Sequence, residues 1–473
     1  MSIFDNLEKF GDSVALEDDS GANVSFNCLI SESDALVSNL VPNSLLLLLG
    51  SNDIPIIHCY VGALRRRVTP ILLSDKSSLE TVRRTLEVFR IRYLFCEEPS
   101  SNFFPSYSRV SSFQNFVLLE SMVHQVTQIN PNLALMLPTS GSTGSHKMVR
   151  ISDKNLKSNT LAIIESLSIG QEDKAITSLP SFYTFGLSVI NSHLMAGACI
   201  RLTKYSVLQR EFWDAIRVAQ ITSFSGVPYM FRILSRLNLK SLLKNTNLRY
   251  VSQAGGKLAP EEVLNWHEMC REFGIEFIVM YGQTEATARM SVLRGDDVRR
   301  LPNSAGRAIV GGQFKIEFSG AKSLTYEEGE VIYLGPNVCM GYAESSSDLI
   351  LGDENHGVLR TGDFGKIDED DFLFILGRNS NLFKIRGVRI DLSELDGKVA
   401  HVCDDFAVYG KSEELHFFVL NDEHVEPIRR ILSELTEIRL SDCQFHVVPL
   451  VPRTETGKVQ YSILEQLLAD KGI

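Results

Sequence analysis

The chain reads SLLLLLG at residues 44–50, IPIIHCYVGALRRR at 54–67 and VTPILLS at 68–74. The first and third stretches are short apolar runs, which are typical of buried strands. The middle stretch has the length of a helix, and its terminal arginines stand where cations balance the negative end of a helix dipole. This order predicts parallel strands in an α/β fold. The leucine run is too short to cross a bilayer, so we expect no stable membrane insertion.

The same alternation of strand-like and helical patterns continues to about residue 300. An apolar helical face follows Ser152, a residue type that caps helix N-termini, and Gly170 marks the expected end of that helix. AGACIRL (196–202) is strand-like, and we expect a helix at 212–219 and another strand after it. The pattern predicts open α/β layers with mostly parallel strands.

Short β runs replace this alternation after about Leu301. FKIEF, GEVIYLG and FLFIL are separated by turn-forming residues, which predicts a small β-rich subdomain. A polar segment follows at 377–381, and roughly ninety residues of mixed pattern come after it. We therefore predict a large N-terminal domain (1–377) of layered α/β subdomains plus the β-rich subdomain, a hinge (378–381), and a small mobile α+β C-terminal domain (382–473).

The bulk composition argues against several classes of function. The 473 residues carry a net charge of −11, whereas a nucleic-acid binder needs a basic face. Eight cysteines are scattered without a C-x-x-C pair, which fits neither a zinc site nor a disulfide framework. The first residues, MSIFDNLEKF, contain acids and no long apolar stretch, unlike a signal peptide. We expect a cytoplasmic protein with reduced thiols and no nucleic-acid partner.

A loop of small hydroxyl residues, TSGSTGSHK (139–147), follows the apolar run 133–137. Its backbone N–H groups can approach phosphate oxygens closely, and its lysine can balance their charge. It does not match the G-x-x-x-x-G-K-[ST] nucleotide motif, and taken alone it is equally well a flexible connection. The candidate phosphate-binding residues are Thr139, Ser140, Gly141, Ser142, Thr143, Gly144 and Lys147.

Three further segments carry candidate residues. YGQTE (281–285) offers an aromatic ring for a base, a threonine for phosphate and a glutamate for Mg²⁺. The TGD segment offers Asp363 to a ribose diol, with Arg378 farther along the chain. PRTETGK (452–458) presents a lysine on a loop. Each segment alone is more often a strand exit, a β-turn or a solvated lysine.

Together and in this order, the motifs resemble those of the superfamily of adenylate-forming enzymes. That superfamily includes acyl- and aryl-CoA synthetases, the adenylation domains of peptide synthetases, and firefly luciferase. The resemblance covers nearly the whole chain and is carried by TSGSTGSHK, YGQTE, TGD, the GR…KIRGVRI segment (377–390) and PRTETGK. It implies an enzyme that uses ATP and Mg²⁺ to join a small carboxylic acid to AMP, and then transfers the acyl group to a thiol.

The resemblance implies a role for each matching residue. The loop 139–147 would hold the β- and γ-phosphates of ATP. The other nucleotide residues would be Tyr281 on adenine with Gly255, Gly256, Gly282 and Gln283 beside it, Thr284 at the α-phosphate, Glu285 on Mg²⁺, and Asp363 with Arg378 at the ribose.

Lys458 would reach from the small domain to the acyl carboxylate and the α-phosphate. Two anions must approach each other there, so fixed positive charge from Lys147, Mg²⁺ and Lys458 is needed. In the family the small domain then rotates about its hinge, which would present Lys384 and Gly387 for thioester formation. The acceptor implied is coenzyme A or the phosphopantetheine of an acyl carrier protein.

Several positions depart from the family pattern or bear on the substrate. His146 stands where proline is usual, Ser380 takes a hinge place generally held by Asp or Lys, and the small domain is a few residues short. Gly186 occupies the place of the aspartate that pairs with the ammonium group in amino-acid-activating members. A buried ammonium without a counter-charge is costly, so we expect an acid without an α-amino group. Tyr183 stands where many acyl- and aryl-CoA synthetases have histidine, and is either a gate of the acid pocket or a packed core residue.

We therefore predict an acyl- or aryl-acid ligase. One alternative is an amino-acid-activating ligase that loads a carrier protein, which Gly186 weakens. Another is a nucleotide-binding protein that has lost catalysis, which the joint presence of Glu285, Asp363 and Lys458 disfavours. A luciferase-type oxygenase stays open from the motifs alone.

Overall fold

The computed structural model describes most of the chain. The residues that it does not describe are 1, 124–126, 139–146, 318–327, 379–381, 386–387, 401, 404, 412–413, 436–437, 455–458 and 471–473.

The stretch 44–74 forms a parallel β–α–β unit, as predicted. Strands β3 (Leu45–Leu49) and β4 (Thr69–Leu73) pair in parallel, and helix α2 (Ile54–Arg66) connects them. The helix ends where Arg67 adopts a left-handed conformation with φ 59°. Arg65 in its last turn forms ion pairs with Glu8 and Asp34. The three arginines therefore mark a helix end, as their position indicated.

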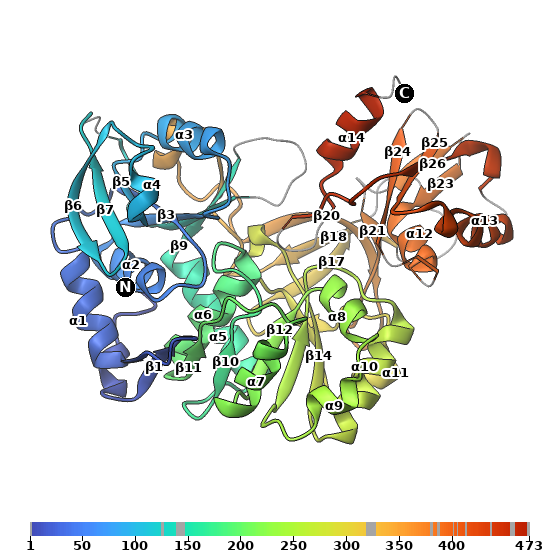
Figure 1. Cartoon of the computed structure of the whole chain (residues 1–473), viewed down its shortest axis with the longest axis horizontal. Coiled ribbons are helices and arrows are strands. Elements are labelled where there is room, and N and C mark those ends of the chain that lie inside the picture. Colours follow the sequence, from blue (N-terminus) through green and yellow to red (C-terminus); the bar gives the residue numbers. More distant parts are fainter. Residues whose placement is uncertain are drawn as a thin grey trace.

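These two strands lie at the centre of an eight-stranded sheet (Figure 1). Its central strands are parallel and its outer strands antiparallel. β19 comes from far downstream in the sequence and pairs with β9 at one edge. The remaining strands, in order across the sheet, are β6 (Tyr107–Phe113), β7 (Phe116–Ser121) and β5 (Tyr93–Glu97) on one side, and β8 (Leu133–Pro138), β9 (Met148–Ser152) and β19 (Gly341–Ala343) on the other.

A second sheet of nine strands lies across from the first, and its middle strands are also parallel. Its strands, in order, are β2 (Asn23–Ser25), β1 (Val14–Glu17), β11 (Cys199–Arg201), β10 (Lys174–Ile176), β12 (Ser223–Gly226), β13 (Tyr250–Gln253), β14 (Glu276–Tyr281), β15 (Ser291–Leu293) and β16 (Arg307–Ala308).

Helices α5 (Asp153–Leu167) and α6 (Thr184–Ala196) lie between the two sheets (Figure 1). Ser152 caps α5, as predicted, by accepting a hydrogen bond from the Asn155 N–H. The prediction that Gly170 ends this helix was wrong. Ser168 turns the chain with φ 52°, and the Gly170 N–H bonds to an Asp173 carboxylate oxygen instead.

A hydrophobic core rich in aromatic residues lies on the other face of the nine-stranded sheet. Trp266 and Phe231 pack edge to face, with ring centroids 4.8 Å apart. Burying one such ring contributes about 2 kcal/mol or more. The other helices of the large domain are α1 (Phe26–Leu36), α3 (Leu79–Val88), α4 (Glu98–Ser101), α7 (Arg210–Val218), α8 (Pro228–Leu234), α9 (Leu239–Leu243), α10 (Pro260–Glu272) and α11 (Asp296–Arg300), with 3-10 turns η1 (Leu7–Phe10), η2 (Thr284–Ala286) and η3 (Ser346–Ile350).

The predicted β-rich subdomain is an antiparallel sheet of four strands. The described residues of the runs FKIEF, GEVIYLG and FLFIL overlap three of these strands, so that prediction is confirmed. The strands, in order, are β17 (Gln313–Glu317), β18 (Gly329–Leu334), β20 (Val358–Ile367) and β21 (Leu373–Arg378).

The C-terminal part has its own hydrophobic cores, around Phe417 and around Leu464. Its contacts with the large domain include an ion pair of 3.6 Å between Arg232 and Asp396. It lies beside β20 and β21 in Figure 1. Its elements are β22 (Leu382–Ile385), β23 (Val388–Asp391), α12 (Leu392–Val399), β24 (Phe406–Lys411), β25 (Glu414–Val419), η4 (Asp422–His424), α13 (Val425–Glu434), η5 (Leu440–Asp442), β26 (Cys443–Val447) and α14 (Tyr461–Asp470).

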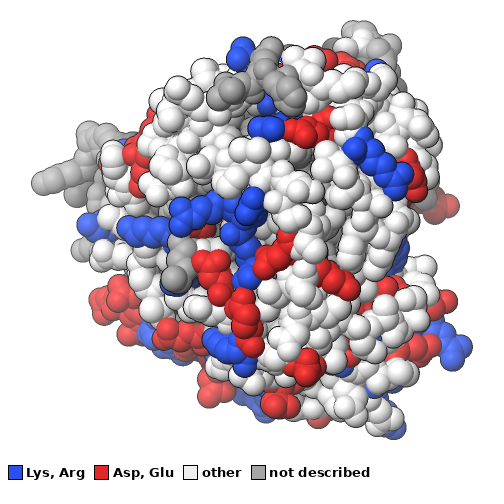
Figure 2. Space-filling view, turned by 90° about the vertical axis from the view of Figure 1, so that its left-hand side faces the viewer, with Lys and Arg blue, Asp and Glu red and all other residues white. Residues whose placement is uncertain are grey.

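The surface shown in Figure 2 carries both signs of charge. A short row of Lys and Arg side chains is bordered by Asp and Glu, so this face has no broad surface of one sign. None of the helices in the described ranges combines the length and apolar character that a bilayer span requires. All eight cysteines are free.

Candidate active site

The carboxyl ends of neighbouring strands bring several predicted residues together. β12, β13 and β14 are adjacent and parallel, so the loops that follow them leave the same edge of the sheet. Gly255 and Gly256 follow β13, and the YGQTE segment starts at the last residue of β14. In open α/β sheets, ligands bind at such edges. The topology thus explains why motifs far apart in sequence share one region.

Tyr281 and Asp363 contact each other across 82 positions of sequence. The Tyr281 hydroxyl donates to Asp363 Oδ2, and the Gln283 amide donates to the Thr361 carbonyl at 3.3 Å. Asp363 is only 2% exposed, and it lies opposite Arg378 in the pairing of β20 with β21. The structure therefore gathers the residues predicted for adenine and ribose.

Lys147 and Glu285 both contact Tyr342, which lies on β19. The Lys147 ammonium is 3.6 Å from the centroid of the Tyr342 ring, where the ring quadrupole attracts a cation. The Tyr342 hydroxyl donates to Glu285 Oε1 at 3.0 Å. Burial and then the Glu285 carboxylate raise the pKa of Tyr342, so this phenol stays a protonated donor at neutral pH. One side chain thus positions a cation and a carboxylate, each suited to a triphosphate with Mg²⁺.

Thr284 connects the YGQTE segment to the segment predicted to bind the acid. Its Oγ1 lies 2.9 Å from Oγ1 of Thr184, the first residue of α6. Tyr183 occupies the N-cap of α6 and makes no side-chain cap hydrogen bond. The N-terminus of a helix favours negative charge, because its first N–H groups have no partner within the helix. An anion next to Thr284 would therefore meet donors from both segments.

The hydroxyl of Tyr183 packs against Gly255. A Cβ atom built on Gly255 would lie 2.6 Å from the Tyr183 oxygen, and Gly255 has φ 85°, so both contact and conformation require glycine. Burial raises the pKa of Tyr183 to about 12, which keeps the phenol neutral. The ring lies between the end of β13 and the start of α6. That position fits either predicted alternative, a gate or a packed tyrosine.

The backbone leaves no room for a side chain at Gly186. A Cβ atom there would lie 2.3 Å from the Pro180 carbonyl oxygen and 2.9 Å from that of Leu179. An aspartate could be placed there only if the segment 179–180 moved. The packing of this segment on α6 therefore excludes an aspartate at position 186.

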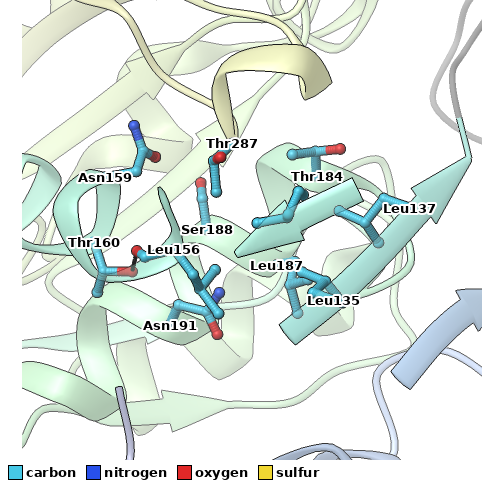
Figure 3. A pocket seen from close by; sticks show the side chains of 11 residues that line it. Leu135, Leu137, Leu156, Asn159, Thr160, Thr184, Leu187, Ser188, Asn191 and Thr287 are labelled. Carbon is cyan, nitrogen blue, oxygen red and sulfur yellow. Dashed lines mark hydrogen bonds between the residues drawn. The ribbon is translucent and has the colours of Figure 1, made fainter. Parts of the chain in front are cut away.

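A small cavity lies beside Thr184, between α5, α6 and β8 (Figure 3). Its free volume is about 10 Å³, roughly room for one water molecule. The hydroxyls of Ser188 and Thr287 in its wall donate to backbone carbonyls. The cavity is therefore too small for an organic acid, and it belongs to the packing behind the site.

Arg453 and Val459 stand on either side of the segment 454–458, and Arg453 contacts the large domain. Arg453 and Val459 pair across its two ends. The Arg453 guanidinium carbon lies 5.0 Å from the centroid of the Tyr229 ring in α8, and an ion pair of 2.9 Å with Asp405 holds it. The residue before Tyr229 is Pro228, which would lie 3.2 Å from a Cβ atom on Gly256. The ends of this loop are therefore near the strand edge that carries the other motifs.

Part of the predicted site lies outside the described residues. Of Arg378 and Lys384, only the backbone is described, in β21 and β22. The predicted residues that lie outside are Thr139, Ser140, Gly141, Ser142, Thr143, Gly144, Gly387 and Lys458.

Three residues of this region were missed in the sequence. Tyr342 and Tyr229 stand in segments without a recognisable local pattern, and only folding brings them to the motifs. Thr184 had a weak signal, because it follows Tyr183 at the expected start of a helix.

Comparisons with known proteins agree with this arrangement. Residues 3–343 match the model of a family described as AMP-binding enzyme. The 2-succinylbenzoate–CoA ligase of Bacillus cytotoxicus is 27% identical over 444 residues, which cover 89% of this chain and 87% of that protein. The ligase of the same name from Bacillus cereus is 28% identical over 353 residues, which cover 73% of this chain and 70% of that protein.

Solved structures share the fold over almost the full length. ATP-bound MatB from Rhodopseudomonas palustris superposes with a TM-score of 0.80 at 20% identity, and the match covers 99% of both chains. The o-succinylbenzoate CoA synthetase of Bacillus subtilis with its acyl-adenylate intermediate gives 0.77 at 21% identity, covering 98% of both. The predicted fold class, a large N-terminal and a small C-terminal domain, is confirmed. The chain therefore belongs to the family of AMP-binding enzymes and is an adenylate-forming acid–thiol ligase.

Proposed function

We propose that this ligase uses ATP and Mg²⁺ to activate an organic acid without an α-amino group, and that it passes the acyl group to coenzyme A. The observation that carries the proposal is the contact between Thr184 and Thr284. It joins the segment proposed for the acid to the motif proposed for the α-phosphate. The acid and the α-phosphorus would meet at this contact.

On the nucleotide side, Tyr281 would cover the adenine and Asp363 would accept from the ribose hydroxyls. Asp363 suits that role because it is buried and already accepts from Tyr281. The loop 139–147 would hold the β- and γ-phosphates. Glu285 would hold Mg²⁺, since carboxylate oxygen is a ligand that this cation prefers and Tyr342 fixes the carboxylate. When bound, the metal neutralises part of the triphosphate charge.

Lys458 would supply positive charge where the acid attacks the α-phosphorus and pyrophosphate leaves. Support comes from Arg453 and Val459, which place the ends of its loop near Tyr229 and the strand edge. Such charge acts on the transition state more than on the bound substrates. Thr284 and Glu285 would complete the catalytic set.

The second half-reaction would need the small domain to turn about the hinge 378–381. That turn would bring the segment 384–387 to the acyl-adenylate for thioester formation. Several relatives carry the name CoA ligase, which favours coenzyme A over a carrier-protein phosphopantetheine as acceptor. The boundaries 1–377 and 382–473 are part of this proposal, and they follow the separate cores of the two parts.

Acid-dependent ATP–pyrophosphate exchange across fatty, aromatic, hydroxy and amino acids tests this function. 2-Succinylbenzoate, the acid named for the relatives, belongs in the panel. We expect exchange with acids that lack an α-amino group, followed by thioester formation when coenzyme A is added. Exchange restricted to α-amino acids would instead identify a carrier-loading, amino-acid-activating enzyme.

A further inference from the structure

Arg289 is a buried cation without an anionic partner. Its side chain is 2% exposed, and within the described part of the chain no carboxylate lies within ion-pair distance of it. Its Nη1 donates to the Met280 sulfur at 2.9 Å, its Nε has no hydrogen-bond partner, and its guanidinium carbon is 4.8 Å from the centroid of the Phe185 ring. A thioether and a ring face are weak partners for a guanidinium group.

Another buried arginine shows what this fold does when an arginine is structural. Arg150 is fully buried, and it donates to four backbone carbonyls and to the Glu354 carboxylate. Among the described residues, Arg289 donates to no backbone carbonyl and to no carboxylate. Burial lowers the pKa of Arg289 to about 10, so it is still a cation at neutral pH. An uncompensated buried charge destabilises a protein, so its retention indicates a partner that arrives from outside.

Arg289 is placed next to the residues proposed for the acid. Phe185, which it covers, follows Thr184, and Met280 precedes Tyr281. The cation therefore contacts the residue that follows Thr184 on one segment and the residue four positions before Thr284 on the other. The Asn159 side-chain amide donates to the Arg289 carbonyl at 2.7 Å. Among the described residues, Oδ1 of Asn159 has no hydrogen-bond partner. Tyr250 and His193 also lie near the guanidinium group, and burial keeps both uncharged at neutral pH.

We propose that Arg289 binds a second carboxylate at the far end of the acid, so that the substrates of this ligase are dicarboxylic acids. The proposal rests on the proposed function, because it takes one carboxylate to be the group that is activated. A guanidinium group matches a carboxylate in shape and hydrogen bonding. A single cation matches the single charge of a carboxylate, whereas a phosphate dianion would be left partly uncompensated. A bound dicarboxylate supplies the acceptor that Arg289 Nε lacks.

The test compares acids of the same skeleton with and without the second carboxylate. Suitable pairs are 2-succinylbenzoate with 4-oxo-4-phenylbutanoate, adipate with hexanoate, and terephthalate with benzoate. Acid-dependent ATP–pyrophosphate exchange gives kcat/KM for each. For the wild type we expect at least one pair in which the dicarboxylate exceeds the monocarboxylate by about 100-fold or more. In Arg289→Met that ratio falls by at least about 30-fold, and Arg289→Lys restores part of it.

Arg294→Met is the matched control. Arg294 belongs to the same hairpin but pairs with Glu276 at the surface. In this variant, the ratio of kcat/KM for the dicarboxylate to kcat/KM for the monocarboxylate should therefore keep its wild-type value. Thermal unfolding gives a second readout, because the preferred dicarboxylate should raise the melting temperature of the wild type more than that of Arg289→Met. Exchange with monocarboxylates alone, or equal loss with both acids of a pair in Arg289→Met, overturns the subsite and leaves the ligase function standing. Absence of exchange with every acid overturns both.

Discussion

The site residues of the large domain bond directly to one another, whereas the contacts between the two domains include, in the described part of the chain, single long arginine side chains. Tyr281 bonds to Asp363, Thr284 to Thr184, and Glu285 to Tyr342. Between the domains, Arg232 of the large domain reaches Asp396, and Arg453 of the small domain covers Tyr229. The first arrangement suits a preformed binding site, as proposed above. The second is suited to breaking and re-forming, which an enzyme with two successive half-reactions requires.

The change expected to separate the two regions most clearly is Lys458→Ala. Adenylate formation should fall by about 10²–10³-fold, because charge at the α-phosphorus is lost. Acyl transfer from preformed acyl-adenylate to coenzyme A should stay within a few-fold of wild type, since the role proposed for Lys458 is confined to the first step. Pyrophosphate exchange and transfer from synthetic adenylate measure the two steps. Arg430→Ala, exposed on α13, is the control. Equal loss of both steps would contradict a role confined to adenylation.

Asp363→Ala tests the group of bonded site residues in the large domain. Losing hydrogen bonds between a carboxylate and the ribose should raise the KM for ATP by about 10- to 100-fold, with little change in the KM for the acid. Asp370→Ala, exposed in the turn between the same two strands, should leave both constants unchanged. Direct titration with an ATP analogue measures the affinity, and an unchanged value would remove Asp363 from the ribose site.

Tyr342→Phe tests a single hydrogen bond in the same region. It removes the hydrogen bond to Glu285 but leaves the ring beneath Lys147. We expect about a five-fold loss in kcat for exchange and a higher Mg²⁺ requirement, because the carboxylate is less well fixed. Tyr342→Leu removes both contacts and should lower kcat for exchange further. If the two variants behave alike, the hydroxyl contributes nothing.

The smallest effect is expected at the contact between the domains. The ion pair between Arg232 and Asp396 is partly exposed and long, and pairs of this kind contribute about 1 kcal/mol or less. Arg232→Met should therefore change the ratio of thioester formation to adenylation by no more than about three-fold. Arg271→Met on the exposed face of α10 serves as reference. A change above ten-fold would mean that this pair controls domain movement.

The sequence predicted the fold best where a pattern is local. The leucine run, the helix after it and the Ser152 cap each depend on neighbours in the chain, and all three are present. The end of α5 was misplaced, because Ser168 adopts the left-handed conformation for which glycine is usually needed. The small β-rich sheet was also predictable, since its short runs are separated by turn residues.

The candidate site was predictable only in part. The motifs supplied residues such as Asp363, but the sequence carries no sign that Tyr342 would lie between Lys147 and Glu285. Contacts of this kind depend on the pairing of β19 with β9. Arg289 shows the same limit, because neither its burial nor its lack of an anion can be read from the letters around it.

The pairing of β19 with β9 has a consequence for how the protein is made. The first sheet contains strands from residues 45 to 152, yet its edge strand is contributed by residues 341–343. A nascent chain on the ribosome therefore exposes the open edge of β9 while strands β10 to β16 of the nine-stranded sheet are being translated. During that time Lys147 lacks its aromatic partner and Tyr281 lacks Asp363. We expect a stalled chain that ends before these residues to bind no nucleotide and to depend on chaperones that shield strand edges.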